Sequence, residues 1–195
     1  TFTLSEASTD FIASDVSVSG GTLSNFSGSG TSYSATFTPK ADRTTDGVIS
    51  VGSGVFSNSS GATNADGSDA NNSVTLSIDT VRPTIALTSD SSSLKAGETA
   101  TLSFSLSEAS TDFVEADVAV SGGSLSDFSG SGTSYSATFT PDAGSTADAV
   151  ISVASAAFSD SSGNSNTDGS DSNNSLTLSI DTVRPTIALT SDSSS

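Results

Sequence analysis

The sequence contains no cysteine and no histidine. Their absence excludes zinc sites and most sites for soft metals, because these sites depend on thiolate and imidazole ligands. The absence of cysteine also excludes disulfides, which stabilise many small extracellular domains. A domain of this size without disulfides often needs another stabilising element, and a bound metal ion is a common one.

Positive charges are scarce, with 5 Lys plus Arg against 22 Asp plus Glu and a net charge of −17. Such a balance argues against binding to nucleic acid or to an anionic membrane surface, and it favours cations as partners. No apolar run approaches the length of a membrane span or of a signal-peptide core. We therefore expect a soluble segment that does not insert into a membrane.

The hexapeptide DTVRPT occurs twice, at 79–84 and at 181–186. Around it, residues 1–93 align without gaps with residues 103–195, at about three positions in four, which indicates a domain-sized repeat of about 100 residues. The hexapeptide has no glycine, and Pro83 restricts Arg82 to extended conformations, so it predicts a short and stiff interdomain joint. A stiff joint between similar modules is the first indication of function.

Placing the joint after Asp79 predicts three parts: 1–79, a repeat that lacks its first strand; 80–181, a complete repeat; and 182–195, the first strand of a following repeat. We expect the sequence to be a segment of a longer array. The incomplete first repeat would have an open strand edge, and the last part contains the strand TIALTS that could fill it. This arrangement predicts head-to-tail self-association through 182–195.

Short stretches of alternating polar and apolar residues indicate about seven β-strands in the complete repeat, with no helical periodicity. The clearest strands place Leu102, Phe104 and Leu106 on one face, and Tyr135 and Phe139 on another. Glycine pairs and Ser-Gly-rich segments such as 129–132 indicate turns between them. The pattern predicts an all-β chain of tandem immunoglobulin-like β-sandwiches and favours it over a jelly roll or a β-solenoid.

Acidic residues gather in two predicted loops, between the second and third strands and between the sixth and seventh. In a seven-stranded antiparallel sandwich both loops return to the end where the domain is entered, beside Asp79 of the preceding joint. Carboxylate, amide and carbonyl oxygens are the ligands of Ca²⁺. The sequence therefore predicts a calcium site at the junction, with candidate ligands Asp79, Glu108, Asp112, Asp160, Asn164, Asp168 and Asp171.

The first repeat has fewer of these oxygen ligands. Asn58 and Ala62 stand where the second repeat has Asp160 and Asn164, and the remaining candidates are Glu6, Asp10, Asp66 and Asp69. The DGSD motifs at 66–69 and 168–171 lack the spacing and the glutamate of an EF-hand loop. Asp and Asn also form turns without any metal, so ordinary Asx turns are the alternative explanation for these loops.

The order of motifs resembles a known family. SEASTDFVEADVAVSGGSLSDFSGSGTSYSATFTP, followed by ISVASAAFSDSSGNSN and LSIDTVRPT, is similar to the bacterial immunoglobulin-like repeats of giant RTX-type adhesins and biofilm surface proteins. The resemblance implies calcium-stiffened extender domains at a Gram-negative cell surface, exported by type I secretion. It also implies that Asp79 and Asp181 match a linker aspartate, and that Asp160 and Asn164 match an acidic loop motif.

Other functions find less support in the sequence. A serine nucleophile would lack its histidine, and a pair of catalytic carboxylates would have to occur in both repeats, so we expect no enzyme. A glycan- or peptide-binding module acting through its loops remains the main alternative. The predicted loops hold almost no aromatic residues for sugar stacking, since Tyr33 and Tyr135 fall in predicted strands. Rows of Ser and Thr would suit ice binding, but they are ordinary on exposed strand faces.

Overall fold

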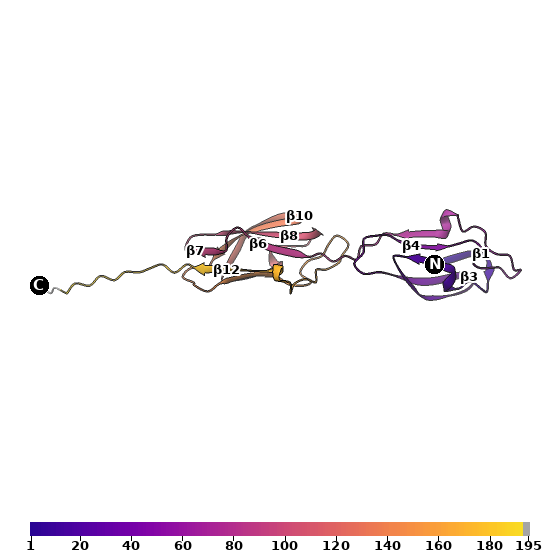
Figure 1. Ribbon diagram of the computed structural model, residues 1–195, viewed down its shortest axis with the longest axis horizontal. Helices are drawn as coiled ribbons and strands as arrows, with labels where there is room; N and C mark the ends of the chain where they lie inside the picture. The colour runs from indigo at the N-terminus through magenta and orange to yellow at the C-terminus, as the bar shows by residue number, and fades with distance from the viewer. Residues whose placement is uncertain (193–195) are drawn as a thin grey trace. The chain divides into compact units, whose positions relative to one another are not determined.

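The computed structural model describes residues 1–192, which form β-strands and short 3-10 turns (Figure 1). The chain divides into unit 1 (Thr1–Val81) and unit 2 (Arg82–Ser195). Each unit contains two sheets with apolar residues between them. The predicted all-β sandwich class is therefore confirmed.

Unit 2 contains both sheets of a full sandwich. One sheet has the strand order β10-β8-β6 and the other has the order β7-β12-β11-β9. All neighbouring strands are antiparallel except β12 and β7, which pair in parallel through Ser179–Asp181 and Ser93–Lys95. The elements are β6 (Ile85–Ser89), β7 (Ser93–Lys95), β8 (Ala100–Ser110), η3 (Glu115–Asp117), β9 (Val118–Ser121), β10 (Gly123–Pro141), β11 (Ala149–Val153), η4 (Ser172–Asn174) and β12 (Ser175–Asp181).

Unit 1 repeats this plan with fewer strands. Its sheets have the orders β1-β3 and β2-β4-β5, and its described residues include no equivalent of β6 or β7. The elements are β1 (Phe2–Ser8), η1 (Ala13–Asp15), β2 (Val16–Ser19), β3 (Gly21–Pro39), β4 (Gly47–Val51), η2 (Ala70–Asn72) and β5 (Ser73–Leu76).

The long strand β10 folds back on itself. A Cβ on Gly123 would lie 2.3 Å from the Thr140 carbonyl oxygen, so the two ends of β10 run side by side. The reversal falls at the Ser-Gly-rich segment, where Gly132 has a φ of 64°, a value that favours glycine. The turn predicted at 129–132 is thus present inside one continuous strand.

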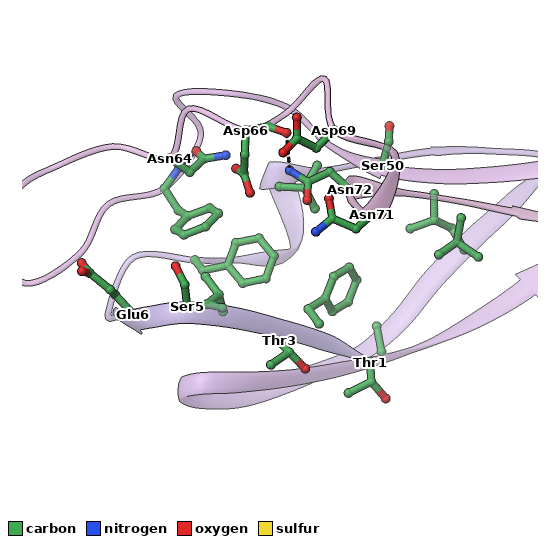
Figure 2. A pocket seen from close by; sticks show the side chains of 18 of the residues that line it. Thr1, Thr3, Ser5, Glu6, Ser50, Asn64, Asp66, Asp69, Asn71 and Asn72 are labelled. Carbon is green, nitrogen blue, oxygen red and sulfur yellow. Dashed lines mark hydrogen bonds between the residues drawn. The ribbon is translucent and has the colours of Figure 1, made fainter.

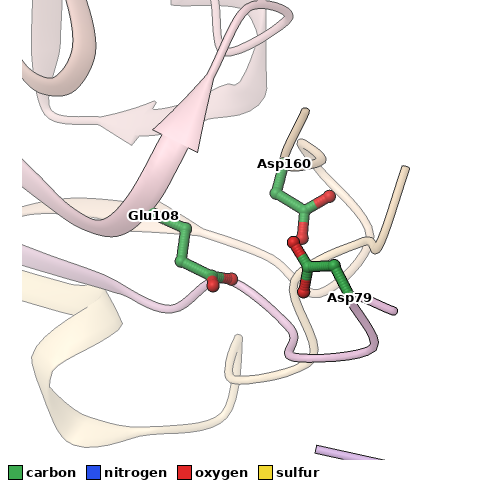
Figure 3. A group of neighbouring side chains, drawn as sticks. All are labelled: Asp79, Glu108 and Asp160. Atoms are coloured by element: carbon green, nitrogen blue, oxygen red, sulfur yellow. The ribbon is translucent and has the colours of Figure 1, made fainter. Parts of the chain in front are cut away.

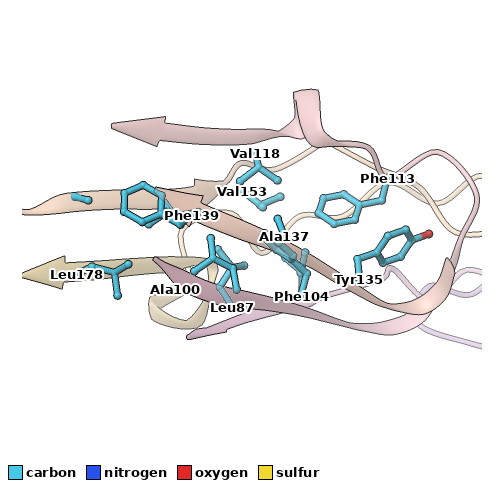
Figure 4. Packing of buried hydrophobic residues seen from close by; sticks show 14 of the residues in the cluster. Leu87, Ala100, Phe104, Phe113, Val118, Tyr135, Ala137, Phe139, Val153 and Leu178 are labelled. Atoms are coloured by element: carbon cyan, nitrogen blue, oxygen red, sulfur yellow. The ribbon is translucent and has the colours of Figure 1, made fainter. Parts of the chain in front are cut away.

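The core of unit 2 lies between its two sheets (Figure 4). Phe104 and Phe139 from one sheet and Ile151 and Leu178 from the other are all 0% exposed. Strand alternation explains the arrangement, because every second residue of β8 points inward, from Ala100 to Leu106. This core supports the β8–β9 and β11–β12 loops, which lie at the end of the unit where β6 begins.

Candidate metal centre

Two buried aromatic side chains hold the acidic loops of unit 2 together. Phe113 lies in the loop from β8 to β9, and Phe158 lies in the loop from β11 to β12. Both are at most 3% exposed, and their ring centroids are 5.3 Å apart. Burial of these rings anchors both loops on the core, so the polar residues beside them meet at the same end of the unit.

Asp112 connects the two loops. One carboxylate oxygen accepts hydrogen bonds from the Ser159 backbone N–H at 2.9 Å and from the Ser110 hydroxyl at 2.7 Å. The other oxygen accepts a hydrogen bond from the Ser159 hydroxyl. Burial acts to raise the pKa of Asp112, but the bonds from Ser159 and Ser110 outweigh it and lower the pKa below its ordinary value of 3.8. Asp112 is therefore ionised at neutral pH and ties the loops together.

Asp160 lies in the same place, buried in the β11–β12 loop with 7% exposure. Its carboxylate accepts hydrogen bonds from the backbone N–H groups of Ser162 and Asn164 at 2.8 and 2.9 Å, and from the Asn164 side-chain amide at 2.8 Å. Burial acts to raise its pKa, whereas the bonds from Asn164 and the loop backbone lower it, and the net pKa is below 3.8. A buried carboxylate is thus held in its charged form.

Glu108 and Asp160 lie close together at this end of unit 2, with one carboxylate oxygen of each within 4.8 Å of the other (Figure 3). Asp79, the candidate ligand from the joint, belongs to unit 1 and lies three residues before Arg82 in the sequence. Negative charges at such distances repel one another, and a divalent cation bound by them removes the repulsion. Carboxylate oxygens are the ligands that Ca²⁺ prefers, so the donor set fits a calcium ion.

The other candidate ligands of unit 2 have structural contacts of their own. Asp168 is 8% exposed and accepts hydrogen bonds from the Ile85 N–H at 2.7 Å and from the Asn166 amide at 3.1 Å, which fixes the start of β6. Asp171 precedes η4, where its carbonyl accepts the Asn174 N–H. Within the described residues of unit 2, neither of them is grouped with Glu108 and Asp160.

Asp181 occupies the position equivalent to Asp79 and is the last residue of β12. Its carboxylate accepts a hydrogen bond from the Val183 N–H at 3.3 Å, as that of Asp79 does from the Val81 N–H at 3.2 Å. The exposed side chain of Asp181 lies at the other end of unit 2 from Asp160, since β12 runs between its loop and Asp181.

Unit 1 has a different arrangement at the equivalent place. The Asn58 amide donates a hydrogen bond to the Glu6 carboxylate, where unit 2 has two carboxylates. Ala62 donates its backbone N–H to the Asn58 side chain at 2.9 Å, but it cannot supply the second hydrogen bond, which the side-chain amide of Asn164 donates in unit 2. The loops are still joined, because hydrogen bonds from Ser57 and Ser8 lower the pKa of Asp10 from 3.8 to about 2. Asp66 and Asp69 are exposed.

The sequence analysis did not find the structural roles of Asn166 and Thr182, which stabilise the two ends of the sandwich. Asn166 is 0% exposed; its side-chain amide donates to the Ala154 carbonyl and the Asp168 carboxylate and accepts a hydrogen bond from the Ala157 N–H, so it fixes the β11–β12 loop. Thr182 closes the opposite end through hydrogen bonds to Asp142 and Ser145. The available signal was identity between the repeats, since Asn64 and Thr80 occupy the equivalent positions and make equivalent bonds.

A family model described as Bacterial Ig-like domain matches residues 1–77 and again residues 79–177. No curated protein and no solved structure matches the chain. Within residues 1–192, no helix is long and apolar enough to cross a membrane. Domains of this family are structural modules, often surface-exposed and generally non-enzymatic. Because the two matches cover most of the sequence and each falls on a sandwich of two sheets, the chain belongs to the bacterial Ig-like domain family.

Proposed function

We propose that this chain is a non-catalytic extender of a bacterial cell-surface adhesin, in which calcium stiffens the junctions between repeats and thereby projects distal binding domains. Two family matches in tandem support the extender role. The proximity of the carboxylates of Glu108 and Asp160 within unit 2 is the single observation that carries the calcium part. An extracellular location fits this role, because calcium is abundant there and weak calcium sites are filled.

Glu108 and Asp160 would hold the ion in unit 2, and Asp79 would contribute from the preceding segment. Asn164 positions Asp160 through its amide, so it supports the site without being required as a ligand. Calcium supplies two positive charges that neutralise the carboxylates. Asp160 itself provides a buried and ionised carboxylate, because the hydrogen bonds that it accepts lower its pKa below 3.8.

The length of the connecting segment supports a mechanical role for Asp79. Thr80 is hydrogen-bonded inside unit 1, to Lys40 at 2.7 Å and to Arg43 at 2.9 Å. Inside unit 2, the Arg82 guanidinium donates to the Ser165 carbonyl at 3.2 Å, and Pro83 is buried. Little free chain remains between these anchors, so an ion bound by Asp79 together with residues of unit 2 would restrict the joint further.

Thermal unfolding in calcium and in EDTA tests the binding step. A ligand that binds only the folded state at a hundredfold excess over its Kd adds about 2.7 kcal/mol of stability. We expect millimolar calcium to raise the unfolding temperature of unit 2, and Asp160→Asn to abolish the increase. Asp171→Asn removes one charge from the same loop outside the carboxylate group and is the matched control, which should keep the calcium response. Identical unfolding curves in calcium and EDTA would remove calcium from the proposal.

Small-angle scattering tests the mechanical step. Calcium should narrow the distribution of maximum dimensions of the two-unit chain, because a restricted joint samples fewer orientations. Asp79→Asn should broaden the distribution again while Glu108 and Asp160 remain in place. Scattering curves that do not change with calcium, despite measurable binding, would leave a calcium-binding module without the stiffening role.

A further inference from the structure

The first two strands of unit 2 belong to different sheets. β6 pairs with β8 in one sheet, and β7 pairs with β12 in the other. The chain from Ile85 to Lys95 therefore crosses between the sheets and is bonded to both. Because β6 follows the entry to unit 2 and β12 precedes the exit, tension along the chain acts first on these two contacts.

The start of β6 is fixed by side chains of unit 2. The Thr84 N–H donates to the Ser107 hydroxyl at 2.8 Å. The Ile85 N–H donates to the Asp168 carboxylate at 2.7 Å. Ile85 is buried, so release of this hydrogen bond without movement of the strand would leave a buried donor unpaired, which costs free energy. The strand is therefore held at its first residue.

The loop that carries Asp168 keeps its shape through hydrogen bonds of its own. The Asp171 N–H donates to the Asp168 carbonyl at 2.7 Å, and the Gly169 N–H donates to the Ser155 hydroxyl at 3.1 Å. A Cβ on Gly169 would lie 2.0 Å from the Ser155 nitrogen, so the two loops touch through their backbones. Unit 1 forms the same loop around Asp66 (Figure 2), with the corresponding bonds at 2.8 and 2.9 Å. The loop therefore offers β6 a preformed acceptor.

β7 and β12 form the second contact and lie side by side (Figure 1). They run in parallel, with Leu94 opposite Ile180. The Ser179 N–H donates to the Ser92 carbonyl at 3.0 Å. Leu94 and Ile180 are at most 3% exposed and belong to the core of unit 2, so this short pair is fixed by backbone bonds and by burial.

The exit from unit 2 is fixed directly after β12. The Thr182 hydroxyl donates to the Asp142 carbonyl at 2.7 Å, and the Thr182 N–H donates to the Ser145 carbonyl at 2.8 Å. Both acceptors lie between β10 and β11, and Thr182 itself is buried. The last residues of β12 are therefore anchored at the end of the unit opposite to Ile85.

We propose that unit 2 carries tension and resists extension by shear, first of β6 along β8 and then of β7 along β12. Tension pulls β7 back toward its first residue and pulls β12 forward toward its last residue. Because the two strands run in the same direction, they are pulled in opposite directions along one axis, and the hydrogen bonds between them are stretched together. Strands separated from one end would instead lose these bonds one at a time.

This inference rests on the proposed extender role, because an extender carries tension along its chain. It adds which contacts resist that tension, and these contacts involve neither Glu108 nor Asp160. Pulling experiments in EDTA therefore test the shear contacts separately from calcium binding. Their failure would leave the calcium site untouched, and the absence of calcium binding would leave the shear contacts untouched.

Single-molecule force spectroscopy of the full chain in EDTA, with two attachment geometries, tests the proposal. The chain has no cysteine, so introduced cysteines are unique attachment points. Thr84→Cys with Val183→Cys loads unit 2 along its strands, whereas Lys95→Cys with Val183→Cys separates β7 from β12 at one end. All three side chains are exposed, so both double variants should keep the same unfolding temperature. We expect an unfolding force at least about twofold higher in the first geometry, because several bonds then break together. Equal forces would overturn the proposal.

Proline substitutions in the first geometry locate the resistance. Ser179→Pro removes the N–H that bonds the Ser92 carbonyl and should lower the unfolding force. Ala119→Pro is the matched control, because Ala119 is an exposed residue of β9, which is neither the entry strand nor the exit strand. It should lower the unfolding temperature and leave the force unchanged. A loss of force as large in Ala119→Pro as in Ser179→Pro would overturn the role of β7 and β12.

Asp168→Ala tests the contact of β6 in the same way. It removes the acceptor of the Ile85 N–H, so it should lower the force in the first geometry and leave it unchanged in the second, which does not load β6. Asp171→Ala removes an exposed carboxylate from the same loop and should leave both forces unchanged. An unchanged force for Asp168→Ala in the first geometry would overturn the role of β6.

Discussion

Phe139 of unit 2 and Phe37 of unit 1 occupy the same position of the repeat, yet only Phe139 is fully buried. The same difference separates Phe104 from Phe2 and Leu178 from Leu76. Unit 2 has β6 and β7, and β12 extends to Asp181 by pairing with β7, whereas its counterpart β5 ends at Leu76. The comparison shows that closely similar local sequences differ in burial when the neighbouring strands β6 and β7 are present or missing.

The acidic loops provide a second comparison. Both units join their loops by the same bonds, from Ser57 to Asp10 and from Ser159 to Asp112. They differ at one pair, because Glu6 accepts a hydrogen bond from Asn58 whereas Glu108 lies beside Asp160. One exchanged side chain therefore replaces a hydrogen bond between an amide and a carboxylate with two neighbouring carboxylates.

The largest expected difference between the units concerns their cores. Phe139→Ala should cost unit 2 about 3–5 kcal/mol of unfolding free energy, because it leaves a cavity in a closed core. Phe37→Ala should cost unit 1 clearly less, because the side chain is already partly exposed. Denaturant titration followed by hydrogen exchange would assign each loss to its unit. Equal losses would mean that unit 1 is closed in solution.

Replacement of the buried tyrosine should, in contrast, lower the unfolding free energy of both units by a similar amount. The Tyr33 hydroxyl donates to the Ser8 carbonyl and the Tyr135 hydroxyl donates to the Ser110 carbonyl, each at 2.8 Å. Replacement of either tyrosine by phenylalanine leaves a buried carbonyl without this donor, which costs about 1–3 kcal/mol. Unfolding measurements on both variants should yield similar losses, and a loss confined to unit 2 would contradict equivalent packing around the two rings.

Asn58→Asp would make unit 1 resemble unit 2 at the acidic loops. In EDTA the variant should lose about 0.5–1 kcal/mol of unfolding free energy in unit 1, because the hydrogen bond from Asn58 to Glu6 is replaced by repulsion between two carboxylates. Millimolar calcium should offset this loss. Calorimetry in calcium and in EDTA measures both effects, and Asn25→Asp, an exposed change of the same charge, is the control that should show no calcium response.

The smallest expected effect is a shift in acid stability. The pKa of Asp10 falls from 3.8 to about 2 on folding, so its contribution is complete above 3.8 and is lost as pH falls toward 2. The pKa of Asp112 is also lowered, and the same sign applies to unit 2. Asp10→Asn and Asp112→Asn should flatten the decline of stability below pH 4 in EDTA. Stability that declines equally steeply in these variants would indicate that other carboxylates control acid unfolding.

The sequence was sufficient for the fold class and for part of the candidate site. Alternation in segments such as 102–106 predicted strands, and strand order predicted that Glu108 and Asp160 lie at the same end of the unit. The structure corrects the placement of Glu108, which lies within β8 and not in the loop that follows it. The sequence did not reveal that Asp168 accepts a hydrogen bond from Ile85, 83 residues earlier. A carboxylate in a turn has the same local sequence signature whether it binds a metal or fixes a distant strand. The roles of Asp112 and Asp168 as ligands therefore remain predictions.

By itself the sequence determined the all-β class, the repeat and the excess of negative charge, because these follow from local alternation, periodicity and composition. The tertiary structure decided which carboxylates lie within 4.8 Å of one another and which aromatic rings are buried. Distances between loops depend on how Phe113 and Phe158 pack on the core, and burial depends on whether β6 covers it. The packing of these rings and the pairing of β6 are both long-range contacts, and the local sequence around a residue does not indicate which distant residue it will contact.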